Sequence, residues 1–361
     1  MAIQDIIAQF AFDGALQAVR EFGSGHINTT YLAQFDSGKA YVLQQINRFV
    51  FQDADALMDN VFAVTDYLRE RIAAEGGDPD RETLRFIRTK DGKKYYETPD
   101  GHAYRAYLFV KDSVCYDKAA TPALFQKSGE AFGIFQQRLR DFPAATLTET
   151  IPHFHDTPWR FEHEFLPALH RAAEAQRKSC QEEITWLLSQ RHQTDSLTKL
   201  LALGRLPLRV THNDTKLNNV LFDKTTDQPL AVIDLDTVMP GSALYDFGDA
   251  IRFGANPADE DEQDLGKVSL DLDYFAAYAE GYLRRAGDAL TDDEKAHLAI
   301  APFVLTLELA LRFLTDYLNG NVYFKTAYPA HNLMRARTQI KLAQDMAAKQ
   351  NAMQAIIASL S

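Results

Sequence analysis

The sequence predicts an α+β protein with a small, strand-rich N-terminal lobe and a large, mainly helical C-terminal lobe. Runs of β-type residues dominate the first part of the chain, helical patterns dominate most of the rest, and a short β-type insertion interrupts the helices at 207–236. With 361 residues, of which 46% are hydrophobic, the chain is long enough for two lobes with a core. We place the N-terminal lobe at 1–110, a connector near 109–113 and the C-terminal lobe at 114–361.

The N-terminal lobe is expected to contain five strands and one helix. The strand predictions are 26–35, 39–46, 84–89, 93–98 and 102–110. Between the second and third strands, apolar residues recur at helical spacing and share one face, at Leu57, Val61, Val64, Leu68 and Ile72.

The C-terminal lobe is expected to be helical around one hairpin. Helices are predicted at 123–142, 159–176 and 180–190. Within the insertion, residues 208–212 lead into a polar loop, and 220–223 and 230–234 form the hairpin strands.

Composition and charge exclude several classes of protein. The net charge of −12 argues against a nucleic-acid partner, because binding to a phosphate backbone needs a basic surface, but it does not exclude a bound nucleotide. Cys115 and Cys180 alone support neither a disulfide framework nor a zinc ribbon. The N-terminus lacks the basic start of a signal peptide, and charged residues interrupt the longest apolar run, 296–314. We therefore expect a cytoplasmic protein without a membrane partner.

The polar segment VTHNDTKLNN at 210–219 is the main functional signal. A hairpin would place Asp214 and Asn219 at one end of its first strand and bring Asp234 to the same end. Oxygen ligands arranged in this way suit Mg²⁺. His212-x-Asp214, four further residues and Asn219 match the spacing of a kinase catalytic loop, and Asp234 takes the place of the metal aspartate. The spacing therefore predicts a protein-kinase-like fold; the alternative is a polar hairpin loop without chemistry.

Each residue of this loop then has a physical role, because phosphoryl transfer depends on positioning and charge neutralisation. Asp214 would orient the acceptor hydroxyl and take its proton, and Lys216 would neutralise the moving phosphoryl group. Asn219 and Asp234 would hold the metal, with Asp236 as a further candidate.

Two residues are assigned supporting roles. His212 is expected to brace the loop, not to react. A literal Asp-Phe-Gly begins at Asp246, but it follows the metal strand and opens a helical pattern. We therefore interpret Asp246 as a helix N-cap or as a brace for the catalytic loop.

These residues resemble the aminoglycoside phosphotransferase and choline kinase superfamily, whose loop runs His-Gly-Asp-Leu-His-x-x-Asn and whose metal strand runs Ile-Asp-Trp/Phe-Glu. The matching positions are His212, Asp214, Asn219, Ile233, Asp234 and, loosely, Asp236. Asn213 replaces the usual glycine, and Lys216 replaces the second histidine.

A closer resemblance, to N-acetylhexosamine 1-kinases, covers nearly the whole chain. It rests on the segments 22–32, 147–161, 207–219, 233–254 and 328–342. This resemblance implies an enzyme that uses ATP and Mg²⁺ to phosphorylate the anomeric hydroxyl of N-acetylglucosamine or N-acetylgalactosamine. The alternatives are a kinase for an aminoglycoside, choline or another small-molecule hydroxyl, and a catalytically silent nucleotide- or sugar-binding protein.

The nucleotide is expected at a glycine-containing loop and at the connector. Backbone amides of Gly23-Ser24-Gly25 would cover the phosphates, although this segment could be a plain turn. Backbone groups of Phe109-Val110-Lys111 would bind adenine. The strand that should carry a lysine for the nucleotide phosphates has Gln44 and Gln45 instead. Gln44 is the candidate nucleotide-binding residue here, because glutamine can donate a hydrogen bond, but it brings no charge. This leaves the binding of the donor open and motivates the silent alternative.

The acceptor is expected near two segments of the C-terminal lobe. On the helix at 305–320, Arg312 could reach the sugar or its phosphate, and Tyr317 could offer an aromatic face. The alternative is a structural ladder of ion pairs along its polar stripe, Glu308, Arg312, Asp316 and Asn319. His153 and His155 could line the acceptor pocket, bind the metal of a zinc hydrolase, or simply pack.

Overall fold

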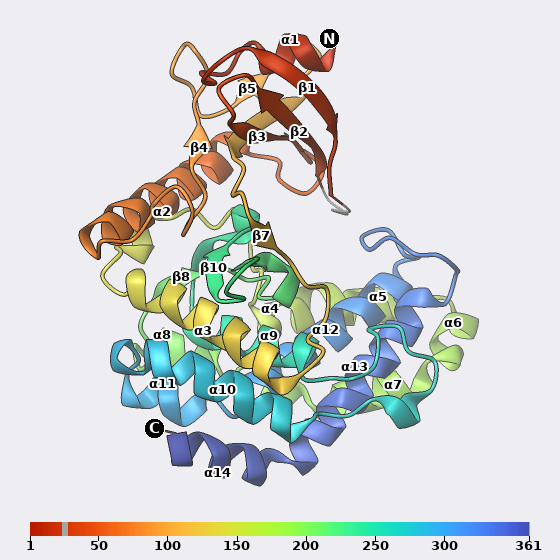
Figure 1. Ribbon diagram of the computed structural model, residues 1–361. Helices are drawn as coiled ribbons and strands as arrows, with labels where there is room; N and C mark the ends of the chain where they lie inside the picture. The colour runs from red at the N-terminus through yellow and green to blue at the C-terminus, as the bar shows by residue number, and fades with distance from the viewer. Residues whose placement is uncertain (24–27, 361) are drawn as a thin grey trace. The chain divides into compact units, whose positions relative to one another are not determined.

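The computed structural model describes residues 1–23 and 28–360, so Ser24 and Gly25 lie outside the described residues. The chain forms two compact units, each built from separate stretches of sequence. Unit 1 comprises Met1–Cys115, Arg138–Ile151 and Asn219–Pro240, and unit 2 comprises Tyr116–Gln137, Pro152–Asn218 and Gly241–Ser361. Unit 1 carries the strand-rich sheet and unit 2 is mostly helical (Figure 1), which confirms the predicted α+β fold class. The single-point lobe boundaries stay a prediction.

Unit 1 is built on an antiparallel sheet, drawn in red to orange in Figure 1. Its strands, in spatial order, are β1 (Leu16–Glu21), β2 (Thr29–Phe35), β3 (Ala40–Ile46), β6 (Ala103–Leu108) and β4 (Phe86–Ile87), with β5 (Tyr96–Glu97) paired to β6. The five predicted strands are confirmed, whereas β1 was not predicted. The central strands β3 and β6 are buried along most of their length, as strands covered on both faces should be.

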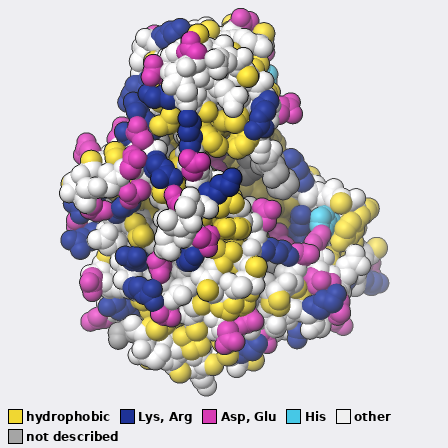
Figure 2. Space-filling view, in the orientation of Figure 1, with side chains coloured by type: hydrophobic (Ala, Val, Ile, Leu, Met, Phe, Trp, Pro, Cys, Tyr) yellow, Lys and Arg dark blue, Asp and Glu magenta, His cyan; other side chains and the backbone are white. Residues whose placement is uncertain are grey.

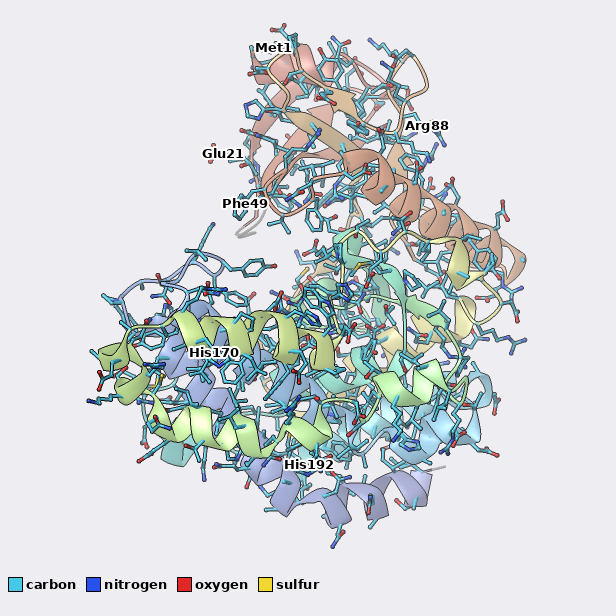
Figure 3. The ribbon with its side chains drawn as sticks, turned by 180° about the vertical axis from the view of Figure 1, so that it is seen from behind. Met1, Glu21, Phe49, Arg88, His170 and His192 are labelled. Carbon is cyan, nitrogen blue, oxygen red and sulfur yellow. The ribbon has the colours of Figure 1, made fainter. Side chains whose placement is uncertain are left out.

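Among the described residues, unit 1 also contains four helical elements. They are α1 (Ile3–Ile7), α2 (Ala54–Ala74), η1 (Ala144–Thr146) and η5 (Leu235–Thr237). Asp53 caps α2 by accepting from the Ala56 amide at 2.9 Å. The Phe62 ring of α2 contacts Phe86 of β4 at 5.7 Å, and the Arg88 guanidinium, labelled in Figure 3, lies over Phe62 at 4.6 Å. The five apolar residues predicted to share a face of α2 are all buried.

A smaller sheet in unit 1 contains the predicted hairpin. Strands β9 (Val220–Asp223) and β10 (Pro229–Val232) pair antiparallel, and β7 (Ser113–Val114) pairs with β9. The hairpin prediction is confirmed for these two strands. The lead-in segment forms β8 (Arg209–Thr211), which belongs to unit 2 and is not part of this sheet.

Unit 2 is mostly α-helical. Its elements are α3 (Pro122–Arg138), α4 (Thr157–Arg160), η2 (Phe161–Phe165), α5 (Leu166–Arg171), α6 (Glu174–Ser179), α7 (Gln181–Ser189), η3 (Arg191–Gln193), α8 (Thr198–Ala202), α9 (Ala243–Gly254), η6 (Leu265–Lys267), α10 (Leu272–Ala286), η7 (Gly287–Ala289), α11 (Asp292–His297), α12 (Ala301–Leu318), α13 (His331–Ala348) and α14 (Gln350–Leu360). The short elements η4 (Leu217–Asn219) and β11 (Met239–Gly241) lie where the chain passes between the units. Helix α12 packs against α13 and α9, and α10 packs against α14 (Figure 1).

The single helix predicted over 159–176 is wrong. The structure has α4, a π-turn, α5 and, after extended residues Ala172 and Ala173, a separate helix α6. Pro167 explains the π-turn, because proline donates no amide hydrogen bond and its ring crowds the preceding turn.

Close contact between α3 and α10 depends on glycine. A Cβ atom on Gly281 would lie 2.0 Å from the Gln126 carbonyl oxygen, and one on Gly129 would lie 2.3 Å from the Tyr278 carbonyl oxygen. Only glycine leaves room for the two backbones at this separation.

No helix within residues 1–23 and 28–360 has both the length and the hydropathy needed to cross a membrane.

Candidate active site

The loop after β8 holds the predicted base on a buried support. His212, Asn213 and Thr215 are buried, whereas the side chains of Asp214 and Lys216 remain 29% and 33% exposed. The Lys216 ammonium lies 2.9 Å from the Asp214 carboxylate, and this neighbouring charge raises the lysine pKa. The loop thus presents one accessible carboxylate beside one accessible cation.

Asp246 supports the catalytic loop from within α9. Its carboxylate accepts hydrogen bonds from the His212 amide at 2.9 Å, from the Asn213 amide at 2.8 Å and from the Gln136 side chain at 3.1 Å. Burial raises the pKa of Asp246, and the donors from His212 and Asn213 oppose this by stabilising the charged form. The N-cap interpretation of Asp246 is wrong, because Ser242 caps α9 through the Leu244 amide.

His212 and Asp249 complete this support. The His212 ring is fully buried against Phe132 and Phe135, with edge-on contacts at 5.6 and 6.1 Å. Asp249 accepts from the Thr215 amide at 3.2 Å and pairs with Arg252 at 2.8 Å. Asp249 was not predicted, although it follows Asp246 by three residues and therefore shares its helix face.

Asn219 and Asp234 lie together in unit 1. The Ile233 amide donates to the Asn219 carbonyl oxygen at 2.9 Å, which fixes the residue before Asp234 to Asn219. Asp234 follows β10 in the left-handed conformation, with φ of 59°, and directly precedes η5. Asp234 was predicted to be the last residue of a strand over 230–234. This is wrong, because β10 ends at Val232.

Asp236 has partners that make it a poor metal ligand. Its carboxylate forms a buried ion pair with Arg105 and accepts from the Asn28 side chain at 2.8 Å. Gln44 accepts from two nitrogens of the same Arg105 guanidinium, at 3.0 and 2.8 Å. Arg105 and Asn28 were missed; a lone arginine in the apolar strand at 102–110 was the available signal for Arg105.

The oxygen donors of Asn219 and Asp234 fit a magnesium site. One carboxylate and one carboxamide leave the remaining positions of an octahedral ion to water and substrate phosphates, as is usual for Mg²⁺ in kinases. Within the described ranges, no group of three or more His, Cys, Asp or Glu residues is placed to hold a metal ion.

The predicted nucleotide residues are placed in unit 1. Gly23 has a φ of +81°, which favours glycine, and the rest of its loop is not described. The Phe109 amide donates to the Ala40 carbonyl oxygen at 2.9 Å, so it is used by the sheet. The Val110 carbonyl oxygen accepts from Ser113 at 2.7 Å, and the Lys111 ammonium contacts the Gly38 carbonyl oxygen.

Arg312 of α12 lies in an aromatic cage. Its guanidinium is 5.2 Å from the Phe154 ring centroid, 5.9 Å from Tyr323 and 5.6 Å from Phe324. Among the residues that the structure describes, it has no hydrogen-bond acceptor, and the nearest carboxylate oxygen, on Glu308, is 3.9 Å away. Burial and the charge of nearby Arg160 lower the pKa of Arg312.

Of the alternative ladder of ion pairs along α12, the described residues show one long contact, 3.9 Å between Arg312 and Glu308. Glu308 instead binds His155 at 2.9 Å and Thr157 at 2.8 Å. Asp316 accepts from three consecutive backbone amides, 322–324, and thereby holds the segment that carries two of the three cage rings, Tyr323 and Phe324. Val322 and Tyr323 in this segment are exposed, and the face drawn in Figure 2 shows hydrophobic side chains at its surface.

The remaining acceptor candidates are placed apart from one another. His155 is buried against Glu308, whereas His153 is partly exposed and stacks on Trp159 at 4.0 Å. The Tyr317 hydroxyl is 2.9 Å from Ser179, so it faces α6 and not the Arg312 cage. His155 thus shares the partner Glu308 with Arg312. His153 and Tyr317 have other partners and do not share this contact.

Comparison with known proteins gives a consistent result. The model of a family described as the phosphotransferase enzyme family matches residues 18–292. An uncharacterized kinase-like protein of Caenorhabditis elegans is 22% identical over an alignment of 304 residues, with coverage of 76% of this chain and 76% of the other. A microcompartment-associated aminopropanol kinase is similar in fold, with a TM-score of 0.62, 18% identity and coverage of 96% of this chain and 97% of the other. An amicoumacin kinase in complex with AMP-PNP and Ca²⁺ has a TM-score of 0.56, 16% identity and coverage of 94% and 92%.

Proposed function

Because the chain belongs to the phosphotransferase enzyme family, we propose that it transfers the γ-phosphoryl group of ATP to the anomeric hydroxyl of an N-acetylhexosamine. Phosphoryl transfer follows from the family, whereas the acceptor is our inference from the resemblance to N-acetylhexosamine 1-kinases. The observation that best supports phosphoryl transfer is the accessible Asp214–Lys216 pair, which lies on a loop whose other polar groups are largely buried.

Asp214 acts as the base in this proposal. It accepts a hydrogen bond from the acceptor hydroxyl and takes its proton as the new oxygen–phosphorus bond forms and the bond from the γ-phosphorus to the bridging oxygen of ADP breaks. Lys216, at 2.9 Å from Asp214, offsets negative charge on the moving group. Asn219 and Asp234 would hold Mg²⁺, which when bound would neutralise charge on the phosphates.

Arg312 supports a neutral, oxygen-rich acceptor. Its guanidinium can donate to hydroxyl, carbonyl or phosphate oxygens, and Glu308, its nearest carboxylate, already binds His155 and Thr157. A cationic acceptor would meet like charge here, from Arg312 and from Arg160. This favours an N-acetylated sugar over choline or an aminoglycoside.

The test is phosphorus NMR of the protein with ATP, Mg²⁺ and either N-acetylglucosamine or N-acetylgalactosamine. We expect an anomeric sugar phosphate to appear together with ADP. If a phosphorylated product formed only with choline or an aminoglycoside, the protein would still be a kinase, but the proposal of a sugar acceptor would be refuted. Binding of ATP without transfer to any acceptor would instead favour the silent alternative.

The same assay tests the base. Replacing Asp214 by Ala should lower turnover by about 10³-fold, within the range typical of general bases, while ATP still binds. An Asp214→Ala enzyme with near-normal turnover would contradict the assignment. A matched control is Asp292→Ala, which removes an aspartate from the first turn of α11, a helix that holds none of the proposed site residues.

A further inference from the structure

The missing lysine of β3 has a structural counterpart on the neighbouring strand. Strands β3 and β6 pair antiparallel, and Gln44 lies directly opposite Arg105. Side chains directly opposite each other project to the same face of a sheet. Arg105 therefore brings a cation to the face on which a lysine at position 44 would have projected.

Arg105 is buried, and its charge is met by an acidic partner and by Gln44. Its side chain is 3% exposed and that of its ion-pair partner, Asp236, is 5% exposed. Gln44 uses one oxygen to accept from the Nε and Nη2 atoms of the guanidinium, at 3.0 and 2.8 Å. The glutamine is thus an acceptor that a guanidinium needs, and a lysine in its place would bring a second cation against the first.

The ion pair connects three segments of unit 1. Asp236 lies two residues after Asp234 and also accepts from the Asn28 side chain at 2.8 Å. Asn28 in turn accepts from the Asn47 amide at 3.0 Å, just after β3. The segment that carries Asp234 is therefore tied through Asp236 to β6 and to the residue that precedes β2.

We propose that Arg105 is a positioning residue that replaces the absent lysine and its acidic partner: by pairing with Asp236 it fixes the segment of Asp234 and keeps Asp236 from binding the metal. This inference rests on the proposed kinase function. It makes Gln44 a required partner of Arg105, not a sign of lost activity.

The sharpest test is Gln44→Lys, which installs the lysine that other kinases use. We expect it to lower the unfolding temperature and to weaken binding of AMP-PNP with Mg²⁺, measured by calorimetry on the full chain, by about tenfold or more, as supporting residues of metal sites typically do. Gln45→Lys is the matched control, because successive strand residues face opposite sides of the sheet. Tighter nucleotide binding in Gln44→Lys than in the wild type would overturn the proposal.

A second set of variants separates positioning from simple packing. Arg105→Lys should keep part of the magnesium-dependent nucleotide binding, because it can still pair with Asp236, and Arg105→Met should lose most of it. We expect the double variant Arg105→Met, Asp236→Asn to bind AMP-PNP with Mg²⁺ no more weakly than the weaker-binding of the two single variants. The reason is that both substitutions remove the same ion pair. Additive losses, or an Arg105→Met protein that binds magnesium and nucleotide as the wild type does, would refute the proposal.

These binding measurements need no acceptor, so they separate the two proposals. A wild-type protein that binds AMP-PNP with Mg²⁺ but phosphorylates nothing would refute the kinase function, while the comparison of Gln44→Lys with Gln45→Lys would still decide the role of Arg105.

Discussion

Replacing Asp246 by Asn removes the acceptor capacity that holds the catalytic loop. Three donors converge on this carboxylate, from His212, Asn213 and Gln136. An amide keeps one acceptor oxygen, so its NH₂ group must face at least one buried donor. In the least costly orientation the oxygen serves His212 and Gln136, and the Asn213 amide is left unsatisfied.

The expected loss can be estimated from these contacts. The unsatisfied amide costs about 1–3 kcal/mol, and replacing two charge-assisted bonds by neutral ones costs about 1 kcal/mol each. Relief of the buried charge at Asp246 offsets part of this, which leaves a loss of about 2–4 kcal/mol. For a chain of 361 residues the unfolding temperature should fall by roughly 3–5 °C, since the entropy of unfolding is about 0.76 kcal/mol per kelvin. Because the unsatisfied amide immediately precedes Asp214, turnover should fall by about 100-fold, as a misplaced catalytic group typically costs.

The assay combines thermal unfolding with steady-state release of ADP. Asp273→Asn is the matched control, since Asp273 is an exposed aspartate in the first turn of α10. If Asp246→Asn melted within about 1 °C of the wild type and turned over within about twofold of it, the carboxylate would not be supporting the loop and the reasoning would fail.

Three further outcomes are expected. Gly281→Ala should destabilise the protein by about 3 kcal/mol or more, since its Cβ would meet a backbone carbonyl at 2.0 Å, whereas Gly287→Ala, with open space around it, should be neutral or stabilising in the same urea titration. Asn213 has a φ of 65°, so Asn213→Gly should keep its stability and Asn213→Val should lose about 1–2 kcal/mol by thermal unfolding. Burial opposes ionisation of Glu308, but His155 and nearby arginines outweigh it and hold the pKa of Glu308 below its usual value. The stabilisation is therefore present above the usual pKa of about 4.3 and is lost as the pH falls through the lowered one, so the difference in urea midpoint between wild type and Glu308→Gln should shrink below about pH 4; a constant difference from pH 7 downward would contradict this.

Local periodicity was sufficient for much of the fold. The β-type runs at 26–35 and 39–46 identified β2 and β3, and the spacing of apolar residues identified α2. These patterns report which face of an element is buried, and each element carries its own pattern. The break within 159–176 was missed because the helical pattern continues through it, although proline changes the backbone hydrogen bonding there.

Long-range polar partners could not be predicted from the sequence. Asp246 was predicted to be an N-cap or a brace, and the choice between these two roles depended on Ser242 taking the cap. The polar stripe of α12 suggested pairs within one helix, whereas Asp316 binds backbone amides six to eight residues later. Arg105 and Asp236 are 131 positions apart, and no local sequence pattern around either residue indicates that the two form an ion pair.

The buried charges bear on the choice between an active kinase and a silent binding protein. Replacing a buried ion pair by apolar residues is often neutral or stabilising, so stability alone does not account for the Arg105–Asp236 pair or for the Asp249–Arg252 pair. Each of these pairs instead fixes a segment that carries a proposed reacting group: Asp236 the segment of Asp234, and Asp249 the loop of Lys216. A protein that only binds a nucleotide has no need to hold a base and its neighbouring cation in place, whereas phosphoryl transfer depends on positioning of this kind. The arrangement of buried charge therefore favours the active enzyme, even though β3 has no lysine.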